Sequence, residues 1–525
     1  MICSDENKVY WCAICNIPII KNDGCPLCGR PGKPAYLGNG EIRPIFDSEK
    51  EWYKELLFSQ GYDSDRYLPG GMCFYYNGSV IIDGQKIFRV IFNERESRWT
   101  IKFYKKYLDN PVDLFGSSLK TILEANSNTL EILENKSLDF INDVFNEYSN
   151  IPRAVSFSGG KDSVATLHLV RQFFPDIDVI YVNTTIDFPE TVDYIHYLTQ
   201  LWSLNLLEVK PEKDFFTMCR ELGPPSKFMK WCCKTTKFGP INRLIDSRYE
   251  DKVIVASGVR KNESNSRSKY LPIAVNKTIP KQILFFPILE WNSLQVWLYL
   301  FYKKIPINEV YHKGYSRIGC WPCPEKTLRE YKKMEITHPN LIKELYSYLE
   351  AFANKNNVND VPNWINSGKW RYRVSRYNKS LINRETLCSV KPQYLYDIKS
   401  VNQLSNIVEF LKVFGPIRLE DKIIKIYNHN LELSIMKNYI RVNYCYNNKK
   451  IIKQFEKQLE KSLNCINCGA CLGNCPIGAI HFQNDHFTVL DSCTNCLRCI
   501  SPKGFRKGCI SLNYKQNQIN INKQT

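Results

Sequence analysis

Cysteine spacing is the feature that most constrains what this chain can fold into. Sixteen of the 21 cysteines fall into three groups, of four, four and eight residues. The N-terminus lacks a basic stretch followed by an apolar one, and no apolar run approaches the roughly 20 residues of a spanning helix. We therefore expect a cytoplasmic protein without membrane segments, in which clustered cysteines indicate metal sites rather than disulfides. Five cysteines outside the groups are expected to be buried, inert thiols: Cys3, Cys73, Cys219, Cys388 and Cys445.

The first group is a pair of C-x-x-C motifs near the N-terminus, formed by Cys12, Cys15, Cys25 and Cys28. Four thiolates in this spacing complete a tetrahedral zinc site, and "CPLCGR" resembles a zinc-ribbon knuckle. Residues 1–38 have little else to bury, so the metal is predicted to be the core of this unit. An iron–sulfur cluster or a redox pair is the alternative interpretation.

The second group combines Cys232-Cys233 with Cys320-x2-Cys323. Neighbouring side chains point in different directions, so an adjacent pair of cysteines rarely serves a core. Such a pair can, however, bind two different irons of one [4Fe–4S] cubane, and soft thiolates suit that cluster. The alternatives are a zinc site or unrelated thiols.

The third group has the spacing of bacterial ferredoxins. One run is C-x2-C-x2-C-x3-C-P, and a second begins with C-x2-C-x2-C and has a late fourth cysteine. In two-cluster ferredoxins the fourth cysteine of each run serves the other cluster. We therefore predict two [4Fe–4S] clusters here, which brings the predicted total to three, and an electron donor that feeds this unit. Their ligands would be Cys465, Cys468, Cys471 and Cys509 for one, and Cys493, Cys496, Cys499 and Cys475 for the other.

A glycine-rich loop follows the first strand-like stretch in the middle of the chain, "RAVSF–SGGKDS–VATLHLVRQFF". Glycines let a backbone approach a phosphate, and a helix N-terminus offers free N–H groups. Val155 and Asp162 occupy places where a Walker A loop needs Gly and Ser/Thr, so this is another type of phosphate loop, or else an ordinary glycine turn. "IDVIYVNTT" and "DKVIVASGV" alternate with helical stretches. The fold class is therefore predicted to be α/β and multidomain, with a central parallel sheet covered by helices on both faces.

The loop "SGGKDS" resembles the PP-loop of the ATP-pyrophosphatase superfamily. With "YVNTTIDFPETVDYI", "GVRKNESNSR", "PILEWNSLQVWLYL" and "NEVYHKGYSRIGCWPCP", residues 150–330 resemble the phosphoadenosine phosphosulfate (PAPS) reductase family. The resemblance implies an adenine nucleotide alpha hydrolase-like fold that binds ATP or another adenine nucleotide with Mg²⁺. It also likens the second cysteine group to the tandem-cysteine cluster of adenylylsulfate reductases. The implied nucleotide-binding residues are Ser158, Gly159, Gly160, Lys161, Asp162, Ser163, Arg260 and Arg267, and the implied catalytic residues are Lys161, Asp162 and Asp187.

The chain departs from the reductases of that family in two ways. Members that cleave ATP carry the full "SGGKDS" loop, whereas reductases of preactivated sulfate tend to have altered loops. The C-terminal Glu-Cys-Gly stretch of those reductases is missing, because the last cysteine is Cys509 in "RKGCISL". The leading hypothesis is ATP-dependent activation coupled to sulfur transfer onto tRNA or another RNA. The rivals are reduction of adenylylsulfate or PAPS to sulfite, and a redox-sensing nucleic-acid-binding protein. Arg260 and Arg267 could alternatively be exposed charges that only keep the protein in solution.

The domain organisation follows from composition and periodicity. A helical stretch over 119–148 is expected to be interrupted at "NSN" (126–128), and residues 325–375 are expected to be helical. The predicted units are a zinc ribbon (1–38), a β-rich PUA-like module (39–115), a helical connector (116–150), the PP-loop domain (151–330), a helical extension (331–397), a small α+β module (398–462), a two-cluster ferredoxin-like unit (463–515) and a tail (516–525).

Two features leave the nucleic-acid question open. The net charge of +18 suits either solvated lysine-rich faces or a polyanionic partner such as RNA. The module 39–115 occupies the place where archaeal-type fusions of this family carry a PUA-like RNA-binding domain. Its aromatic and basic residues are either an RNA-stacking surface or part of a half-buried sheet: Tyr75, Tyr76, Trp99, Lys102, Lys105 and Lys106.

Overall fold

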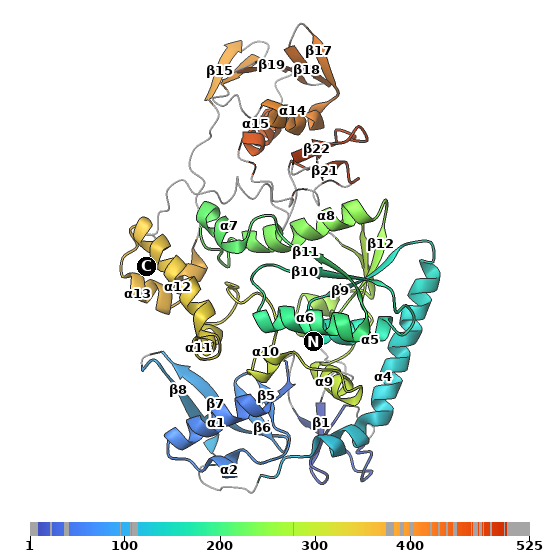
Figure 1. Ribbon diagram of the computed structural model, residues 1–525, viewed down its shortest axis with the longest axis vertical. Helices are drawn as coiled ribbons and strands as arrows, with labels where there is room; N and C mark the ends of the chain where they lie inside the picture. Colours follow the sequence, from blue (N-terminus) through green and yellow to red (C-terminus); the bar gives the residue numbers. More distant parts are fainter. Residues whose placement is uncertain are drawn as a thin grey trace.

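A computed structural model of the chain shows three layers of structure along its long axis (Figure 1). A parallel sheet with its helices lies in the middle, the N-terminal sheets lie at one end, and the C-terminal sheet lies at the other. The structure describes residues 9–20, 24–35, 41–94, 96–105, 107, 114–276, 278–373, 383–388, 393–397, 404–420, 423–428, 431–436, 439–444, 449–463, 465, 471, 475, 477–483, 486–497 and 499–500.

The central sheet has six strands in the order β11-β10-β9-β12-β14-β13. All neighbours are parallel except β13, which pairs antiparallel with β14 at one edge. This arrangement confirms the predicted fold class. The strands are β9 (Arg153–Phe157), β10 (Asp178–Val182), β11 (Asn205–Val209), β12 (Val253–Ser257), β13 (Ile273–Val275) and β14 (Gln282–Phe285).

Both faces of the central strands of this sheet are buried, and successive side chains lie on opposite faces. Val155 and Phe157 of β9 join the core that contains α5, whereas Ala154 joins a smaller core with Ile245 of α8. Continuous apolar strands such as "VIVA" are the expected result of burial on two sides. Figure 1 shows α5 and α6 on one face and α8 on the other. The helices are α5 (Lys161–Val170), α6 (Pro189–Trp202), α7 (Phe215–Leu222), α8 (Gly239–Arg248) and α9 (Ser293–Tyr302).

The N-terminal part contains two separate antiparallel sheets. The first has the order β2-β1-β3, and the second runs from β4 to β8 in chain order. The strands are β1 (Val9–Cys12), β2 (Ile17–Ile19), β3 (Lys33–Ala35), β4 (Arg43–Pro44), β5 (Phe74–Tyr76), β6 (Ser79–Ile82), β7 (Gln85–Asn93) and β8 (Arg98–Phe103). The second sheet also carries helices that the sequence analysis missed, α1 (Asp47–Ser59) and α2 (Ser64–Tyr67). Glu49, Tyr53 and Leu57 recur every four residues and are buried, which is the helical spacing.

Helix α4 (Leu119–Glu147) is continuous, so the expected interruption at "NSN" is wrong. Asn126 is buried within the helix, where its amide donates to the carbonyl oxygens of Ile122 and Pro18. Its side-chain oxygen accepts the N–H of Ile20 at 3.1 Å. A polar residue that normally favours turns is thus satisfied inside a helix, because it holds the first sheet.

Residues 325–373 are largely helical, as predicted, in α11 (Leu328–Thr337), α12 (Pro339–Lys355), α13 (Val361–Asn366) and the 3₁₀ turn η5 (Lys369–Tyr372), which follow the short α10 (Glu309–His312). Assigning the whole of 331–397 to helix was wrong, since β15 (Asn383–Cys388) and β16 (Gln393–Asp397) are strands. They join the antiparallel sheet β15-β16-β20-β19-β18-β17. Its other elements are β17 (Ile417–Glu420), β18 (Ile423–Asn428), β19 (Leu431–Met436), β20 (Tyr439–Tyr444), α14 (Leu404–Leu411), η7 (Lys412–Phe414) and α15 (Lys449–Leu463); a hairpin β21 (Ile480–Gln483)–β22 (His486–Val489) follows.

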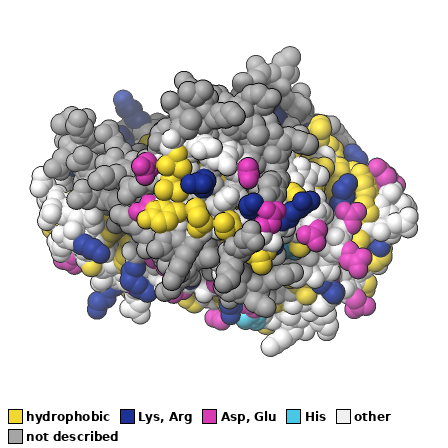
Figure 2. All heavy atoms as spheres, turned by 90° about the horizontal axis from the view of Figure 1, so that it is seen from above, with side chains coloured by type: hydrophobic (Ala, Val, Ile, Leu, Met, Phe, Trp, Pro, Cys, Tyr) yellow, Lys and Arg dark blue, Asp and Glu magenta, His cyan; other side chains and the backbone are white. Residues whose placement is uncertain are grey.

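The surface at the C-terminal end does not gather charge of one sign. Figure 2 shows Lys and Arg side chains interspersed with Asp and Glu side chains over the described residues of that face. The excess of basic residues in the chain is therefore not concentrated into one visible patch there. Within the described ranges, none of the helices combines the length and the apolar character needed to cross a bilayer.

Candidate functional site

The phosphate-loop residues form a turn between the end of β9 and the start of α5. Gly159 has φ +68°, a left-handed conformation that L side chains rarely adopt. The Ser163 hydroxyl closes the loop, because it accepts the N–H of Ser158 at 3.2 Å and donates to the carbonyl oxygen of Gly160 at 2.9 Å. The loop thus has a fixed shape at the carboxyl end of the sheet, where open α/β sheets bind ligands.

Gly258 and Tyr311, which come from distant segments of the chain, contact this loop. A Cβ on Gly258, just after β12, would lie 2.5 Å from the backbone carbonyl of Asp162, so only glycine allows this approach. The N–H of Lys161 donates to the hydroxyl of Tyr311 at 2.9 Å. The hydroxyl of Tyr311 thus accepts a hydrogen bond from one of the first N–H groups of α5, which have no partner within the helix.

The charged side chains of the loop are paired in a compact cluster. Lys161 Nζ lies 2.8 Å from Asp162 Oδ2 and 3.0 Å from Glu41 Oε2. Arg260 places Nε 2.6 Å from Asp162 Oδ1 and Nη2 2.6 Å from Glu41 Oε1. Two cations and two carboxylates therefore alternate around one site. The neighbouring charges hold the pKa of Glu41 well below its usual range despite its burial, and raise that of Arg260.

Arg267 does not join this cluster. It pairs with Glu263 across the 3₁₀ turns η3 (Lys261–Glu263) and η4 (Arg267–Lys269), and Arg317 reaches the same carboxylate oxygen at 2.8 Å. The other oxygen of Glu263 accepts the N–H of Arg260 at 2.9 Å. Glu263 thus holds two arginines at the rim of the site, and only Arg260 lies within it.

Asp187 ends the loop after β10, on the same edge of the sheet. Its carboxylate accepts the N–H of Thr184 at 3.0 Å and the hydroxyl of Tyr181 at 3.3 Å. Burial raises the pKa of Asp187, and these hydrogen bonds together with the charge of Lys237 oppose that rise. A carboxylate that is buried yet held by donors is a candidate base or metal-facing group.

The middle cysteines come together from two segments. Cys232 and Cys233 lie at the start of the π-helical turn η2 (Cys233–Phe238), and Cys320 and Cys323 lie in a loop after α10. All but Cys323 belong to one packed core, in which Cys232 is buried. The Cys320 thiol lies 3.7 Å from the hydroxyl of Thr184.

The thiols of this group perturb one another. The hydrogen bond from Cys232 is the main cause that lowers the pKa of Cys233 to about 6, with help from Lys237 and Lys230. Burial raises the pKa of Cys320 to about 12. The negative charge of Cys233 also raises the pKa of Cys323, in addition to burial. The four thiols thus lie near enough to influence one another, whereas the described residues whose ligand atoms all lie within 4.8 Å of one another are the N-terminal cysteines.

The segment 184–191, which comprises the loop after β10 and the first residues of α6, lies between the middle cysteines and the phosphate loop. At its first residue, Thr184, the hydroxyl faces Cys320. At the other end, Asn308 donates to both the hydroxyl of Thr191 and the carbonyl oxygen of Gly159, at 3.2 Å each. Residues 184–191, with Asp187 among them, thus contact both halves of the candidate site.

The N-terminal cysteines form a close group. The Sγ atoms of Cys12, Cys15, Cys25 and Cys28 all lie within 4.8 Å of one another. Cys12 Sγ and Cys28 Sγ are 3.6 Å apart, and the N–H of Cys15 donates to Cys12 Sγ at 3.3 Å. Sulfurs around one tetrahedral ion with metal–sulfur bonds of about 2.3 Å lie roughly 3.8 Å apart. The donor set therefore fits one metal ion of zinc size.

The C-terminal cysteines are described in part. Cys468 and Cys509 lie outside the described residues, as do Cys3 and Cys445 of the five single cysteines. Cys475 and Cys499 are buried in the core of the C-terminal unit, and Cys465, Cys471 and Cys493 pack against it. Burial raises the pKa of Cys499, to about 11, with smaller contributions from Cys475, Cys493 and Cys471. Elsewhere Cys73 and Cys219 are buried, as expected, and Cys388 ends β15.

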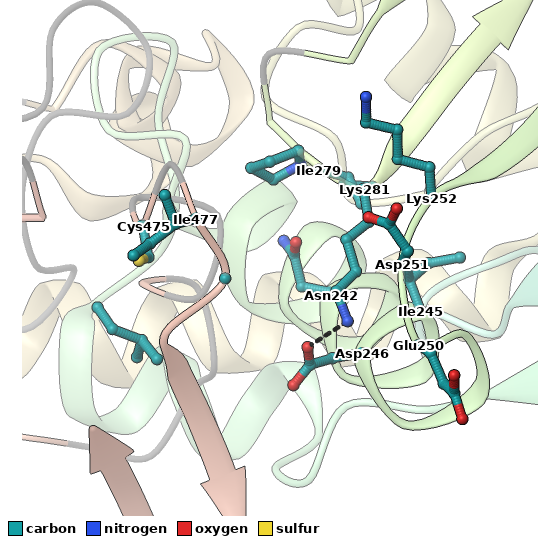
Figure 3. A pocket seen from close by; sticks show the side chains of 13 residues that line it. Asn242, Ile245, Asp246, Glu250, Asp251, Lys252, Ile279, Lys281, Cys475 and Ile477 are labelled. Carbon is teal, nitrogen blue, oxygen red and sulfur yellow. Dashed lines mark ion pairs between the residues drawn. The ribbon is translucent and has the colours of Figure 1, made fainter. Parts of the chain in front are cut away.

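Cys475 also lines a cavity of about 220 Å³ between the C-terminal unit and the central domain (Figure 3). The opposite wall comprises the end of α8 and the turns that lead into β12 and β14. Asp246 lies in this wall, with Lys281 at 3.0 Å and His481 Nδ1 at 2.5 Å. The C-terminal unit thus contacts the amino-terminal edge of the sheet, opposite the edge that carries the phosphate loop.

The aromatic residues of the β-rich module face the protein rather than solvent. Arg329 of α11 lies over the rings of Tyr75 and Trp99, at 5.6 Å and 5.7 Å from their centroids. Tyr76 is buried, whereas Lys102 and Lys105 are exposed. Lys106 lies outside the described residues. For the aromatic residues, the half-buried interpretation is the one that the contacts favour.

Sequence reasoning missed Glu41, Ser293 and Tyr311 as members of the site. Tyr311 belongs to the segment "NEVYHKGYSRIGCWPCP", whose resemblance to the family could have identified it as a site residue. Ser293 donates to Glu41 Oε2 at 2.6 Å and to the carbonyl oxygen of Ile42 at 2.8 Å. Glu41 carried no signal, because it precedes the phosphate loop by 120 positions and its partner Arg260 lies still farther along the chain.

Comparison with known proteins places these features in context. Residues 152–326 match the family model described as phosphoadenosine phosphosulfate reductase domain. The chain is similar to an uncharacterized protein of Methanocaldococcus jannaschii, with 32% identity over 53% of this chain and 58% of that protein. It is also similar to an adenosine 5'-phosphosulfate reductase of Geobacillus sp., with 28% identity over 37% of this chain and 80% of that enzyme.

Among solved structures, a PAPS reductase from Candida auris in complex with phosphate is similar over 38% of this chain and 96% of that chain. The sequence identity is 19% and the TM-score is 0.31. The chain thus spans somewhat more than half of the archaeal relative's length, and these matches to the reductases cover little more than its central third.

Proposed function

We propose that this protein, whose residues 152–326 match the phosphoadenosine phosphosulfate reductase domain, activates a substrate with ATP and transfers sulfur to it, with an RNA base as the acceptor. The observation that carries the proposal is the segment 184–191, which comprises the loop after β10 and the first residues of α6. Thr184 faces Cys320 at one end of it, and Thr191 at the other end is bonded to Asn308, which also donates to Gly159 of the phosphate loop. Nucleotide chemistry and sulfur chemistry near opposite ends of one short segment suit a two-stage reaction at one acceptor.

The nucleotide would bind at the carboxyl edge of the sheet. Its phosphates would lie against the turn from Ser158 to Ser163 and the start of α5, where the helix dipole and Lys161 favour negative charge. Arg260 would supply a planar pair of donors for a phosphate oxygen. Mg²⁺ is expected to enter with the phosphates, since it is bound largely through them.

The chemistry balances without an external oxidant or reductant. A carbonyl oxygen of the base attacks the α-phosphate of ATP, and the bond to pyrophosphate breaks. Hydrosulfide then attacks the activated carbon, the bond to the AMP oxygen breaks, and the thiocarbonyl base and AMP are released. In this proposal Asp187 would accept the proton that the acceptor loses in the first stage, and Lys161 would stabilise the charge on the departing pyrophosphate.

The cysteine groups fit different metals. Four close N-terminal thiols suit one zinc ion. The middle thiols approach from two segments and include an adjacent pair, which suits the several irons of a [4Fe–4S] cluster. Such a cluster would supply sulfur or electrons next to the acceptor. The ferredoxin spacing at the C-terminus supports two more clusters, held in a unit that an external donor reduces.

An exposed patch beside the middle cysteines supports an RNA partner. Phe228 is 60% exposed and Tyr372 is 39% exposed, and their ring centroids are 6.5 Å apart. Lys227 Nζ lies 4.5 Å from the centre of the Tyr372 ring, and Lys230 lowers the pKa of Cys233. Aromatic rings that bases can stack on, flanked by lysines, are the usual elements of single-stranded nucleic-acid surfaces.

The test is a reaction of anaerobically purified, iron-replete protein with ATP, hydrosulfide and total RNA. Pyrophosphate is measured, and thionucleosides are detected by mass spectrometry. We expect both products in equal amounts, and neither with the Lys161→Ala variant. Absence of pyrophosphate with every RNA fraction would rule out the proposal.

A second candidate is reduction of adenylylsulfate to sulfite, which the similarity to enzymes named adenosine 5'-phosphosulfate reductase favours. In that reaction the sulfur–oxygen bond to AMP breaks and two electrons from a low-potential donor leave sulfite and AMP. Sulfite formed from adenylylsulfate with reduced ferredoxin, without any thionucleoside from RNA, would select this candidate. The complete "SGGKDS" loop weighs against it.

A further inference from the structure

The carboxylate of Glu41 lies where a nucleotide phosphate is expected. Its oxygens contact Lys161 Nζ at 3.0 Å and Arg260 Nη2 at 2.6 Å. These are the two cations that would bind a phosphate in the proposed function. Glu41 belongs to the segment just before β4, outside the matched domain of residues 152–326. An anion supplied by another part of the chain therefore occupies the cations of the phosphate loop.

The two cations are closed to solvent in this arrangement. The Lys161 side chain is 2% exposed and the Arg260 side chain is 1% exposed. Their charges are balanced by Asp162 and Glu41, so the cluster has no net charge to attract a polyphosphate. An incoming phosphate would also be repelled by the Glu41 carboxylate, and that repulsion is strong because the site is largely dry.

We propose that Glu41 is a built-in competitor of the nucleotide phosphates, and that phosphate binding displaces it from Lys161 and Arg260. The proposal rests on the proposed function, since it takes the phosphate loop as a nucleotide site. The exchange is between like groups: one anion leaves two buried cations and another replaces it. Lys161 and Arg260 thus have an anionic partner both before and after the nucleotide binds, as buried charges require.

The displacement of Glu41 would involve only a short stretch of the chain. Ser293, the first residue of α9, donates to both Glu41 and the carbonyl of Ile42, so release of Glu41 frees this segment from α9. The next anchor is Arg43, which donates to Glu49, to the carbonyl oxygen of Gly314 at 2.8 Å and to Ser316 at 3.1 Å. Arg43 does not touch the phosphate loop in these contacts. The segment at residues 41–42 would therefore move while β4 stays in place.

This coupling would link nucleotide binding to the N-terminal part of the protein. The cysteine group around Cys12 and the sheet β4–β8 lie on either side of the Glu41 segment in the chain.

The experiment compares the affinity of full-length, metal-replete protein for ATP and for inorganic pyrophosphate by calorimetry. Glu41→Gln keeps the side-chain shape and a hydrogen-bond acceptor for Ser293, but removes the negative charge. We expect both affinities to rise about 10-fold or more, because the like charge that competes with the phosphates is removed. Glu290→Gln is the matched control, because Glu290 pairs with Lys261 outside the cluster and is 59% exposed.

Hydrogen exchange supplies a second readout on the wild type. We expect amide exchange at residues 41–42 to quicken when pyrophosphate binds, and exchange in β4–β8 to stay as it was. Glu41→Asp, which keeps the charge on a shorter side chain, should leave ATP affinity closer to the wild-type value than Glu41→Gln does. This variant separates the loss of charge from a change in folding.

The outcomes also separate this inference from the proposed function. If ATP binds and Lys161→Ala abolishes binding, but Glu41→Gln leaves affinity unchanged or weaker, the inference is wrong and the nucleotide site stands. If neither the wild type nor Glu41→Gln binds ATP or pyrophosphate, both are wrong. Binding by Glu41→Gln alone would support both.

Discussion

The N-terminal and the middle cysteine groups offer four thiols each, yet the protein builds them in opposite ways. The N-terminal thiols come from one short stretch and lie within 4.8 Å of one another beside a three-stranded sheet. The middle thiols come from two distant segments and lie against a large core that contains Trp231 and Trp321. Under the proposed function, a metal would organise the polypeptide in the first case, and the folded polypeptide would organise the metal site in the second.

The difference bears on what each site does. A local site whose ligands carry much of its core is a structural element, because without metal little holds the strands together. A site assembled by a whole domain can lose its metal and keep its fold. Its position beside Thr184 and the Asp187 loop suits chemistry rather than stability.

The largest expected effect is on the N-terminal unit. Replacing Cys12 with serine should release its metal and unfold β1–β3, since structural zinc contributes about 10–16 kcal/mol to such units. Hydrogen exchange would show loss of amide protection over residues 9–20 and 24–35, with the central sheet still protected. Full protection in a metal-free variant would show that the sheet does not depend on metal.

The middle group should respond in the opposite way. Cys233→Ala should retain the fold and ATP binding but lose cluster iron and turnover, by more than the roughly 10- to 100-fold that loss of an outer-shell partner costs. The matched variant is Cys219→Ala, which removes another buried thiol from the same core and should keep both iron and activity. Unfolding of Cys233→Ala, with Cys219→Ala folded, would make the middle group structural as well.

A smaller effect is expected where the N-terminal unit attaches to the rest of the protein. In the wild type the Asn126 side chain is the hydrogen-bond partner of the Ile20 N–H and the Pro18 carbonyl oxygen. Asn126→Ala removes this partner from both groups. A buried group left without its partner costs about 1–3 kcal/mol, so β1–β3 should exchange amide hydrogens faster while α4 remains helical. Unaltered exchange in β2 would show that the contact contributes nothing to docking.

The smallest expected effect concerns the charge of Asp187. Its pKa is raised by burial, so the ionised side chain destabilises the folded state, and that penalty is absent at a pH below its unfolded-state value. Asp187→Asn should therefore match the wild type near pH 3 and unfold at a higher temperature near pH 7. A midpoint difference that shrinks as the pH rises would contradict burial as the dominant cause.

The sequence predicted the parts of the site that depend on local spacing. "RAVSF–SGGKDS" gives a strand, a loop and a helix, and the C-x-x-C pairs give the N-terminal thiol group. Alternating β and helical stretches gave the parallel sheet, because burial on both faces leaves a clear apolar pattern. The strands β15 and β16 lack such a pattern, and "NRETLC" was assigned to a helical extension.

Contacts between distant segments could not be predicted. Glu41 and Ser293 join the site only through the tertiary fold, and nothing in the neighbouring residues marks them. Asn126 was interpreted as a helix breaker because its local tendency is toward turns, yet the first sheet satisfies it. The aromatic residues Tyr75 and Trp99 suggested an RNA surface, whereas Arg329 from α11 covers them.

The central claim is that the nucleotide site and the middle cysteine group act together through residues 184–191. The most direct test is the electron paramagnetic resonance spectrum of the reduced, iron-replete protein, recorded with and without ATP. We predict that ATP alters the spectrum of the wild type and leaves the spectra of Cys233→Ala and Lys161→Ala unchanged. An unaltered wild-type spectrum in the presence of bound ATP would contradict the claim.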